Sequence, residues 1–167
     1  MKYDRTKLIE KLIQHEGLKL QVYQDTLGID TIGIGRNLED RGITKEELDT
    51  LDIPNMDVIY EHGINEIDAV YLATNDVQIV EKELLSAHPC VAELDAVRQL
   101  VLVDMAFNMG VPRLRKFKKM WAAIHENDFM TAAKEMLDSR WATQVKLRSH
   151  TLANMMHHGE SDGKEKS

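Results

Sequence analysis

Residues 14–38 read QHEGLKLQVYQDTLGIDTIGIGRNL, and this stretch decides the fold that the sequence predicts. The apolar spacing before it predicts a helix that ends at Glu16, beside a glycine of the kind that follows helices. A strand around Tyr23, a turn from Asp25 and a glycine-rich strand from Thr31 follow. The stretch therefore predicts a helix that runs directly into a small β-hairpin.

The remainder of the chain has mainly helical patterns. A capping box at 44–47 opens a short helix, and residues 94–109 are apolar on all sides, which is typical of a central buried helix. Segment 56–62 has no decisive pattern. We expect helices over residues 4–17, 44–51, 65–87, 94–109, 116–125, 129–139 and 145–157. The predicted fold class is α+β and mostly helical.

Composition and charge limit the classes of function. The 167 residues favour one domain, and a single cysteine excludes an intrachain disulfide. The net charge of −7 argues against a general nucleic-acid binder, so no nucleic-acid partner is expected. Residues 113–150 nevertheless carry 9 Lys and Arg against 4 Asp and Glu. That basic segment fits either a polyanion such as cell wall or an ordinary solvated surface.

The chain shows neither a signal peptide nor an apolar run long enough to span a membrane. We therefore expect no stable membrane insertion, and something else must deliver the protein if its target lies outside the cytoplasm. A monomer is the default expectation. No metal or cofactor is expected, because the histidine pair at 157–158 has no acidic or cysteine partner at ligand spacing.

Two carboxylates in the opening stretch suggest a chemistry. Glycoside hydrolysis needs one protonated carboxyl group to donate to the leaving oxygen and one ionised group on the opposite side of the bond. A bend from helix to hairpin could bring Glu16 and Asp25 across a cleft, with the Thr31 hydroxyl holding a water. The spacing alone does not single out this pair, because an acidic chain contains many such pairs.

The motif as a whole resembles the catalytic stretch of the T-even phage lysozymes, the endolysins of glycoside hydrolase family 24. It consists of Glu-Gly, then an aspartate in Tyr-x-Asp-Thr-x-Gly, then Thr-Ile-Gly-x-Gly. Weaker similarity continues at 94–98, 106–110 and 139–141, so the resemblance covers most of residues 8–150. Segment 40–64 matches poorly.

The resemblance implies a two-lobed, lysozyme-like fold over residues 1–158. A small β-containing lobe would span 18–65, and a long helix over 66–87 would join it to a helical lobe. That lobe would combine residues 1–17 with 88–158. Residues 159–167 are expected to form a disordered tail.

The family's residue roles carry over to matching positions. The resemblance implies that Glu16 is the general acid, and that Asp25 and Thr31 position the attacking water. The family inverts the configuration at the anomeric carbon. Substrate contacts are implied for Asn37, Phe107, Asn108, Met120 and Glu135. No metal takes part.

Three further residues are implied as supporting ion pairs. Arg148 falls on an arginine that pairs with the catalytic glutamate. Arg36 stands where the family's best-known member has a histidine that pairs with an aspartate, and the matching aspartate is Asp76. We predict an Arg36–Asp76 ion pair that is insensitive to pH near neutrality, because arginine does not titrate there.

The sequence thus predicts a muramidase that hydrolyses the β-1,4 bond between N-acetylmuramic acid and N-acetylglucosamine in the glycan strand of peptidoglycan. The expected role is that of a phage or prophage endolysin, held in the host cytoplasm until a holin releases it to the periplasm and cell wall. The alternatives are a tail-associated or bacterial lysozyme acting on related glycans, or an inactive peptidoglycan-binding module.

Overall fold

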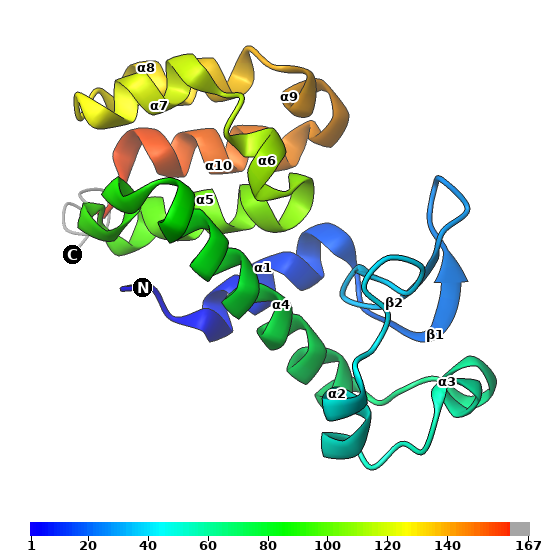
Figure 1. The fold of residues 1–167 in the computed structure, drawn as a ribbon. Helices are drawn as coiled ribbons and strands as arrows, with labels where there is room; N and C mark the ends of the chain where they lie inside the picture. Colours follow the sequence, from blue (N-terminus) through cyan, green and yellow to red (C-terminus); the bar gives the residue numbers. More distant parts are fainter. Residues whose placement is uncertain (161–167) are drawn as a thin grey trace, which may run out of the picture. The chain divides into compact units, whose positions relative to one another are not determined.

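A computed structural model describes residues 1–160 and confirms the predicted mostly helical α+β class (Figure 1). Three strands occur near the N-terminus, and helices form most of the remainder of the described chain. The elements are α1 (Arg5–Glu16), β1 (Lys19–Gln24), β2 (Asp30–Gly33), β3 (Arg36–Asn37), α2 (Lys45–Thr50), α3 (Met56–His62), α4 (Glu66–Ala87), the 3₁₀ helix η1 (Pro89–Glu93), α5 (Ala96–Met109), α6 (Val111–Leu114), α7 (Lys118–His125), α8 (Phe129–Leu137), α9 (Arg140–Val145) and α10 (Leu147–His158).

The chain divides into two compact units. The sheet unit is Arg5–Asp76, and the helical unit combines Met1–Asp4 with the residues from Val77 onward. The division falls within α4, whose first half belongs to the sheet unit. The grouping expected from the resemblance differs, because it placed residues 1–17 with the helical lobe. Only two residues separate α1 from β1, and this short connection keeps the helix beside the sheet.

The sheet is antiparallel, with strand order β1-β2-β3. Tyr23 of β1 lies opposite Thr31 of β2, and Thr31 lies opposite Asn37 of β3. Gly33 and Gly35 have φ values of +68° and +73°, which let the chain reverse between β2 and β3. The sequence analysis did not predict β3, because a two-residue strand is too short to show an alternating pattern.

The core of the sheet unit is apolar and lies against one face of the sheet. Ile32 of β2 is fully buried there with Ile59 of α3 and Leu72 of α4. The predicted capping box is present at α2: the Thr44 side chain accepts from Glu47 N, and the Glu47 side chain accepts from Thr44 N. Segment 56–62, which had no decisive pattern, forms α3 behind the N-cap Asn55.

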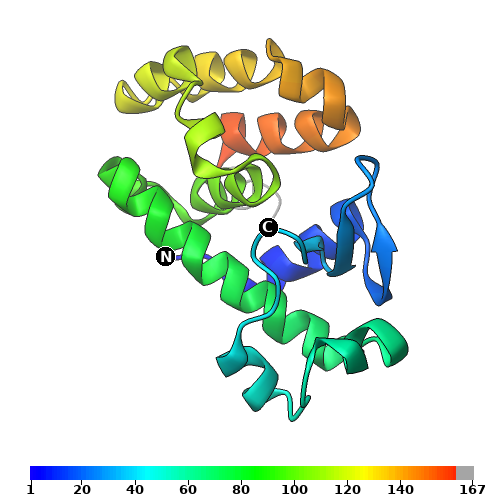
Figure 2. The same cartoon turned by 45° about the vertical axis from the view of Figure 1, so that its right-hand side comes forward.

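Within the helical unit, α5 is the buried central helix that its composition predicts. Its residues from Gln99 to Ala106 are all buried. Helices α7, α8 and α10 run side by side in both ribbon views (Figures 1 and 2). Three short helices were not predicted: η1, α6 and α9. Pro112 lies in the first turn of α6, where its missing N–H costs no helical hydrogen bond. Lys146, with φ +45°, separates α9 from α10, which is the helix expected over 145–157.

The predicted tail over 159–167 lies mostly outside the described residues. Gly159 is the C-cap of α10, and the Glu160 carboxylate accepts a hydrogen bond from Ala96 N at 3.2 Å. These two residues are therefore placed by contacts with α10 and α5.

Candidate active site

Glu16 is the last residue of α1 and is half-buried. The helix ends there because Gly17 has φ +82°, and Gly17 N donates to Ile13 O at 2.9 Å. A Cβ atom placed on Gly35 would lie 3.8 Å from Glu16 Oε2. The turn between β2 and β3 thus brings its backbone close to the Glu16 carboxylate. The positive φ of Gly35, rather than lack of space, favours glycine there.

Asp25 follows β1 and is held in one conformation by its own turn. Its Oδ1 accepts hydrogen bonds from Leu27 N at 2.8 Å and Ile29 N at 3.0 Å. Its backbone N–H donates to Ile29 O at 3.0 Å, so one further hydrogen bond joins the chain segments beyond the end of β1. Oδ2 makes no hydrogen bond within the described part of the chain. One carboxylate oxygen therefore fixes the turn, and the other remains available for a ligand.

Thr31 is buried in β2, with 4% of its surface exposed. Its hydroxyl donates to Ile29 O at 2.9 Å. Because that bond uses the only hydroxyl hydrogen, the Thr31 oxygen can interact with a further group only as an acceptor.

The sheet register places several polar side chains on one face. Directly opposite residues of antiparallel strands share a face, so Tyr23, Thr31 and Asn37 form a row across the three strands. Asp25 is two residues beyond Tyr23 and points to the same side. Asn37 Oδ1 accepts from Glu39 N and Asp40 N at 2.8 and 2.9 Å, so the predicted contact residue is held rigidly.

Tyr23 is a residue of this face that the sequence analysis placed on a strand but assigned no role. Burial raises the pKa of its phenol, and the negative charges of Glu16 and Asp25 raise it further. Both carboxylates therefore favour the neutral form of the phenol. The period of two between Tyr23 and Asp25 was the signal that could have identified it.

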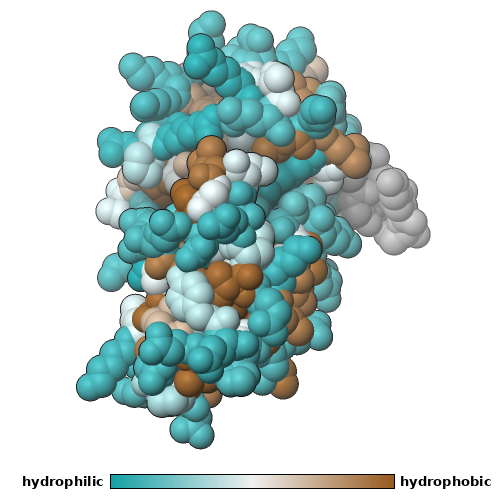
Figure 3. Space-filling view, turned by 90° about the vertical axis from the view of Figure 1, so that its right-hand side faces the viewer, coloured by the Kyte–Doolittle hydropathy of each residue, from teal (hydrophilic) through white to brown (hydrophobic). Residues whose placement is uncertain are grey.

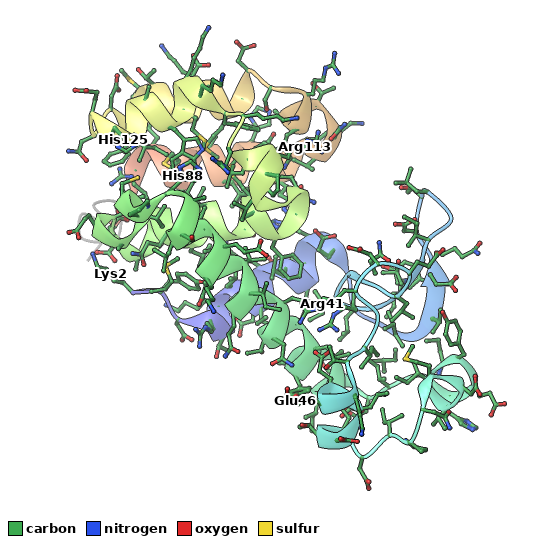
Figure 4. The ribbon with its side chains drawn as sticks, in the orientation of Figure 1. Lys2, Arg41, Glu46, His88, Arg113 and His125 are labelled. Atoms are coloured by element: carbon green, nitrogen blue, oxygen red, sulfur yellow. The ribbon has the colours of Figure 1, made fainter. Side chains whose placement is uncertain are left out.

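The opposite face of the sheet carries Arg36, which is buried and whose guanidinium donates five hydrogen bonds. Its Nε lies 2.9 Å from Asp76 Oδ2, so the predicted ion pair is present. Its Nη atoms donate to both carboxylate oxygens of Glu47 and to two backbone carbonyl oxygens, those of Gly42 and Leu72. Arg41, which is labelled in Figure 4, also pairs with Asp76. The side chains of this network hold β3, α2 and α4 of the sheet unit together.

Glu47 was predicted only as a capping residue, yet it is the main partner of Arg36. Burial acts to raise the pKa of this carboxyl group. Hydrogen bonds from Arg36, Asn75 and Thr44 N outweigh burial and lower the pKa to about 2. Glu47 is therefore ionised throughout the neutral range.

In the helical unit, Arg148 and Asp104 form a buried ion pair. Arg148 donates from Nε and Nη2 to Asp104 Oδ1 at 2.9 and 2.7 Å. The predicted partner, Glu16, belongs to the sheet unit, so the pairing of Arg148 with Glu16 stays a prediction.

The four substrate-contact residues predicted in the helical unit separate into two pairs. Met120 and Glu135 line a groove of about 690 Å³ that Trp141 also lines. Asn108 of α5 accepts a hydrogen bond from Trp141 Nε1 at 2.9 Å, whereas Phe107 is its neighbour in α5 and does not line the groove. Five cations that were not predicted as site residues surround the groove, with Arg113 projecting from α6 (Figure 4): Arg113, Lys116, Lys118, Lys119 and Arg140.

Neither a metal centre nor a membrane span is evident in the described chain. Among residues 1–160, no three His, Cys, Asp or Glu side chains are grouped so that they could hold a metal ion. No helix in that range is both long and apolar enough to cross a membrane. The face of the molecule in Figure 3 is mostly hydrophilic, and its hydrophobic residues form small separate patches.

Carboxylates at a helix end and in an adjacent hairpin turn are an arrangement suited to glycoside hydrolysis, and comparison with known proteins identifies the family. The profile of the phage lysozyme family matches residues 13–157. The chain belongs to this family and is thus a glycoside hydrolase of the lysozyme class, a muramidase that acts on peptidoglycan.

Individual relatives support this assignment. The chain is 31% identical over 154 residues to probable T4-type lysozyme 1 of Dictyostelium discoideum, covering 86% of this chain and 89% of that protein. It is 30% identical over 162 residues to probable T4-type lysozyme 2 of the same organism, covering 92% and 95%. It is also 31% identical over 154 residues to the pre-baseplate central spike protein Gp5 of Enterobacteria phage T4, covering 85% of this chain but 26% of Gp5.

Proposed function

We propose that the chain is an endolysin that cleaves the β-1,4 bond between N-acetylmuramic acid and N-acetylglucosamine. Glu16 is the general acid, and Asp25 with Thr31 holds the attacking water. The observation that carries this proposal is the sheet register, which pairs Tyr23 with Thr31. Strand alternation then assigns Asp25, two residues after Tyr23, to the side of Thr31. The approach of Glu16 to Gly35 in the adjoining turn supports a shared site.

The proposed reaction divides the work between the two carboxyl groups. Protonated Glu16 donates its proton to the glycosidic oxygen as the bond to the anomeric carbon breaks. A water held by Asp25 Oδ2 and Thr31 Oγ1 attacks that carbon from the opposite side and transfers a proton to Asp25. The product has inverted configuration, because water attacks directly and no covalent intermediate forms.

The groove of the helical unit is a candidate binding surface for an anionic glycan. Its cationic rim complements the carboxylates of an anionic wall, although the whole chain is acidic. Met120 and Glu135 contribute to this surface. Through its hydrogen bond with Trp141, Asn108 supports the surface from behind.

Clearing of outer-membrane-stripped Gram-negative cells tests the catalytic assignment. Glu16→Gln removes the proton donor and should abolish the loss of turbidity. Glu10→Gln is the matched control, since Glu10 is exposed on the same helix, and it should clear cells at the wild-type rate. Equal clearing by wild type and Glu16→Gln would refute the mechanism.

The endolysin role predicts accumulation in the host cytoplasm and release by a holin to the periplasm and cell wall. Cells that express the chain alone should stay intact and should lyse within minutes when the inner membrane is permeabilised. Cells that express Glu16→Gln should not lyse after the same treatment. Lysis of unpermeabilised cells at equal expression would contradict dependence on a membrane pore.

A tail-associated lysozyme is the second candidate, because 85% of this chain resembles part of the spike protein Gp5. In that case the chain should co-sediment with phage particles, whereas an endolysin should remain in the supernatant. An inactive wall-binding module is the third candidate. It predicts binding to purified peptidoglycan without hydrolysis by the wild type.

A further inference from the structure

Tyr23 lies on the polar sheet face, in the edge strand β1. It lies directly opposite Thr31, and Asp25 follows it by two residues on a strand whose pairing continues to Ile29. Cross-strand neighbours and residues two apart share one side of a sheet. The half-buried phenol therefore stands on the same side as the two groups proposed to hold the attacking water.

Hydrogen-bond requirements determine how such a water would be oriented. The Thr31 hydroxyl has given its hydrogen to Ile29 O, so its oxygen accepts. Asp25 Oδ2, when ionised, also only accepts. A water between them must donate both of its hydrogens, one to each residue. Its two lone pairs then remain, one for the anomeric carbon and one for a donor.

Tyr23 is suited to supply that donor. Its hydroxyl makes no hydrogen bond within the described residues, although Thr31 lies opposite Tyr23 on the same sheet face. Burial and the charges of Glu16 and Asp25 raise its pKa, so the phenol keeps its hydrogen over the range in which the enzyme works. A neutral phenol can donate one hydrogen bond without giving up its proton.

We propose that the Tyr23 hydroxyl donates a hydrogen bond to the attacking water, and that Tyr23, Asp25 and Thr31 together fix the orientation of that water. This inference rests on the proposed function. The water oxygen bonds to the anomeric carbon, the glycosidic bond breaks, Glu16 protonates the leaving oxygen, and Asp25 takes a proton from the water. The Tyr23 proton stays on the phenol, so the residue orients the nucleophile and exchanges no proton.

Steady-state kinetics of Tyr23→Phe on soluble, uncross-linked peptidoglycan strands test the proposal. Loss of one orienting hydrogen bond should lower kcat about three- to tenfold and leave KM unchanged. Both limbs of the pH–rate profile should keep their positions. The melting temperature should not change, because the hydroxyl makes no hydrogen bond within the described structure.

Tyr60→Phe is the matched control. The Tyr60 hydroxyl donates to Asp30 Oδ2 at 2.9 Å in the same unit, and Asp30 lies opposite Gln24, so its side chain points away from the polar face. Its kcat should equal that of the wild type. Three results for Tyr23→Phe would each overturn the role of Tyr23. These are an unchanged kcat, a change in KM alone, and a shifted limb of the pH–rate profile with unchanged maximal kcat. An inactive wild type would instead overturn the proposed function.

Discussion

The two faces of the three-stranded sheet differ in how fully their polar side chains are hydrogen-bonded within the protein. On one face, Arg36 directs its guanidinium at two carboxylates and two carbonyl oxygens and is 3% exposed. On the other, Asp25 Oδ2 and the Tyr23 hydroxyl make no hydrogen bonds within the described residues. Alternation along β2 and β3 separates the two sets, since Arg36 and Asn37 are consecutive residues.

Because of this difference, we expect one face of the sheet to contribute to stability and the other to activity. A buried charge costs free energy unless it is fully paired. The guanidinium of Arg36 must therefore have all its hydrogen-bond partners if the unit is to fold. Polar groups with spare hydrogen-bonding capacity at a partly exposed face can instead bind water or substrate. Changes on the Arg36 face should therefore affect unfolding, and changes on the Tyr23 face should affect turnover.

The largest expected effect follows from Arg36→Met. It leaves Glu47 and Asp76 without their main partner, and such a loss costs about 3–5 kcal/mol of unfolding free energy. Urea unfolding at pH 7 measures it. Arg41→Met is the control, because Arg41 is 30% exposed and its pair with Asp76 should contribute about 1 kcal/mol or less. Equal losses of unfolding free energy in the two variants would contradict the larger contribution of Arg36.

On the other face, Thr31→Val preserves shape and removes the acceptor for the water. We expect kcat to fall by about 10²-fold, at the lower end of the range for assisted proton transfer, with about 1 kcal/mol of stability lost with the bond to Ile29 O. Thr74→Val is the control, since the Thr74 hydroxyl donates to Val70 O at 2.8 Å on α4. If both variants kept wild-type turnover, the Tyr23 face would have no catalytic role.

Glu47 makes the stability contributed by the Arg36 network depend on pH in the acid range. Its folded pKa of about 2 is below the ordinary 4.5, so its contribution to stability is complete above pH 4.5 and is lost as the pH falls towards 2. Glu47→Gln should be less stable than wild type at pH 7 and should show a shallower loss of stability from pH 5 to 2. Urea midpoints across this range provide the measurement, and an unchanged slope would refute the assignment.

The smallest expected effect concerns neutral pH. Arginine keeps its charge at these pH values, and Glu47, with a pKa of about 2, stays ionised between pH 5 and 8. Asp76→Asn should therefore lower the melting temperature by the same amount throughout that range. A steep titration near pH 6.5 that this variant abolished would contradict that expectation.

A second pH dependence is expected from His88, which stacks on Trp121 with ring centroids 3.6 Å apart. Burial lowers its pKa, and the charges of Arg115 and His125 lower it further. The protein should lose stability as the pH falls through 6.5, because protonation then favours the unfolded state. His88→Gln should flatten this dependence in thermal melts from pH 5 to 7.

Local sequence signals predicted most helices and the hairpin. Thr44 and Glu47 marked α2, and the apolar run from residue 94 marked α5, since both signals lie within one element. The same signals did not predict β3 or the role of Glu47 as the partner of Arg36. That partnership depends on how β3 and α2 meet in space, which no periodicity within either element encodes.

The candidate site was predicted chiefly through resemblance. Glu16, Asp25 and Thr31 were ordinary polar residues until the whole motif was compared with a family. Local sequence patterns predict no role for Tyr23, because its role depends on the cross-strand register that pairs it with Thr31. The resemblance supplied Asp76 as the partner of Arg36, because matching positions of a family carry information about long-range contacts that local patterns lack.

The configuration of the first product tests the central claim that the Tyr23 face holds the attacking water. NMR during the first minutes of hydrolysis, before mutarotation, distinguishes the anomers of the new reducing N-acetylmuramic acid. Direct attack by a held water predicts the α-anomer as the initial product. Initial formation of the β-anomer would show that a covalent intermediate precedes the water and would contradict this account of Asp25, Thr31 and Tyr23.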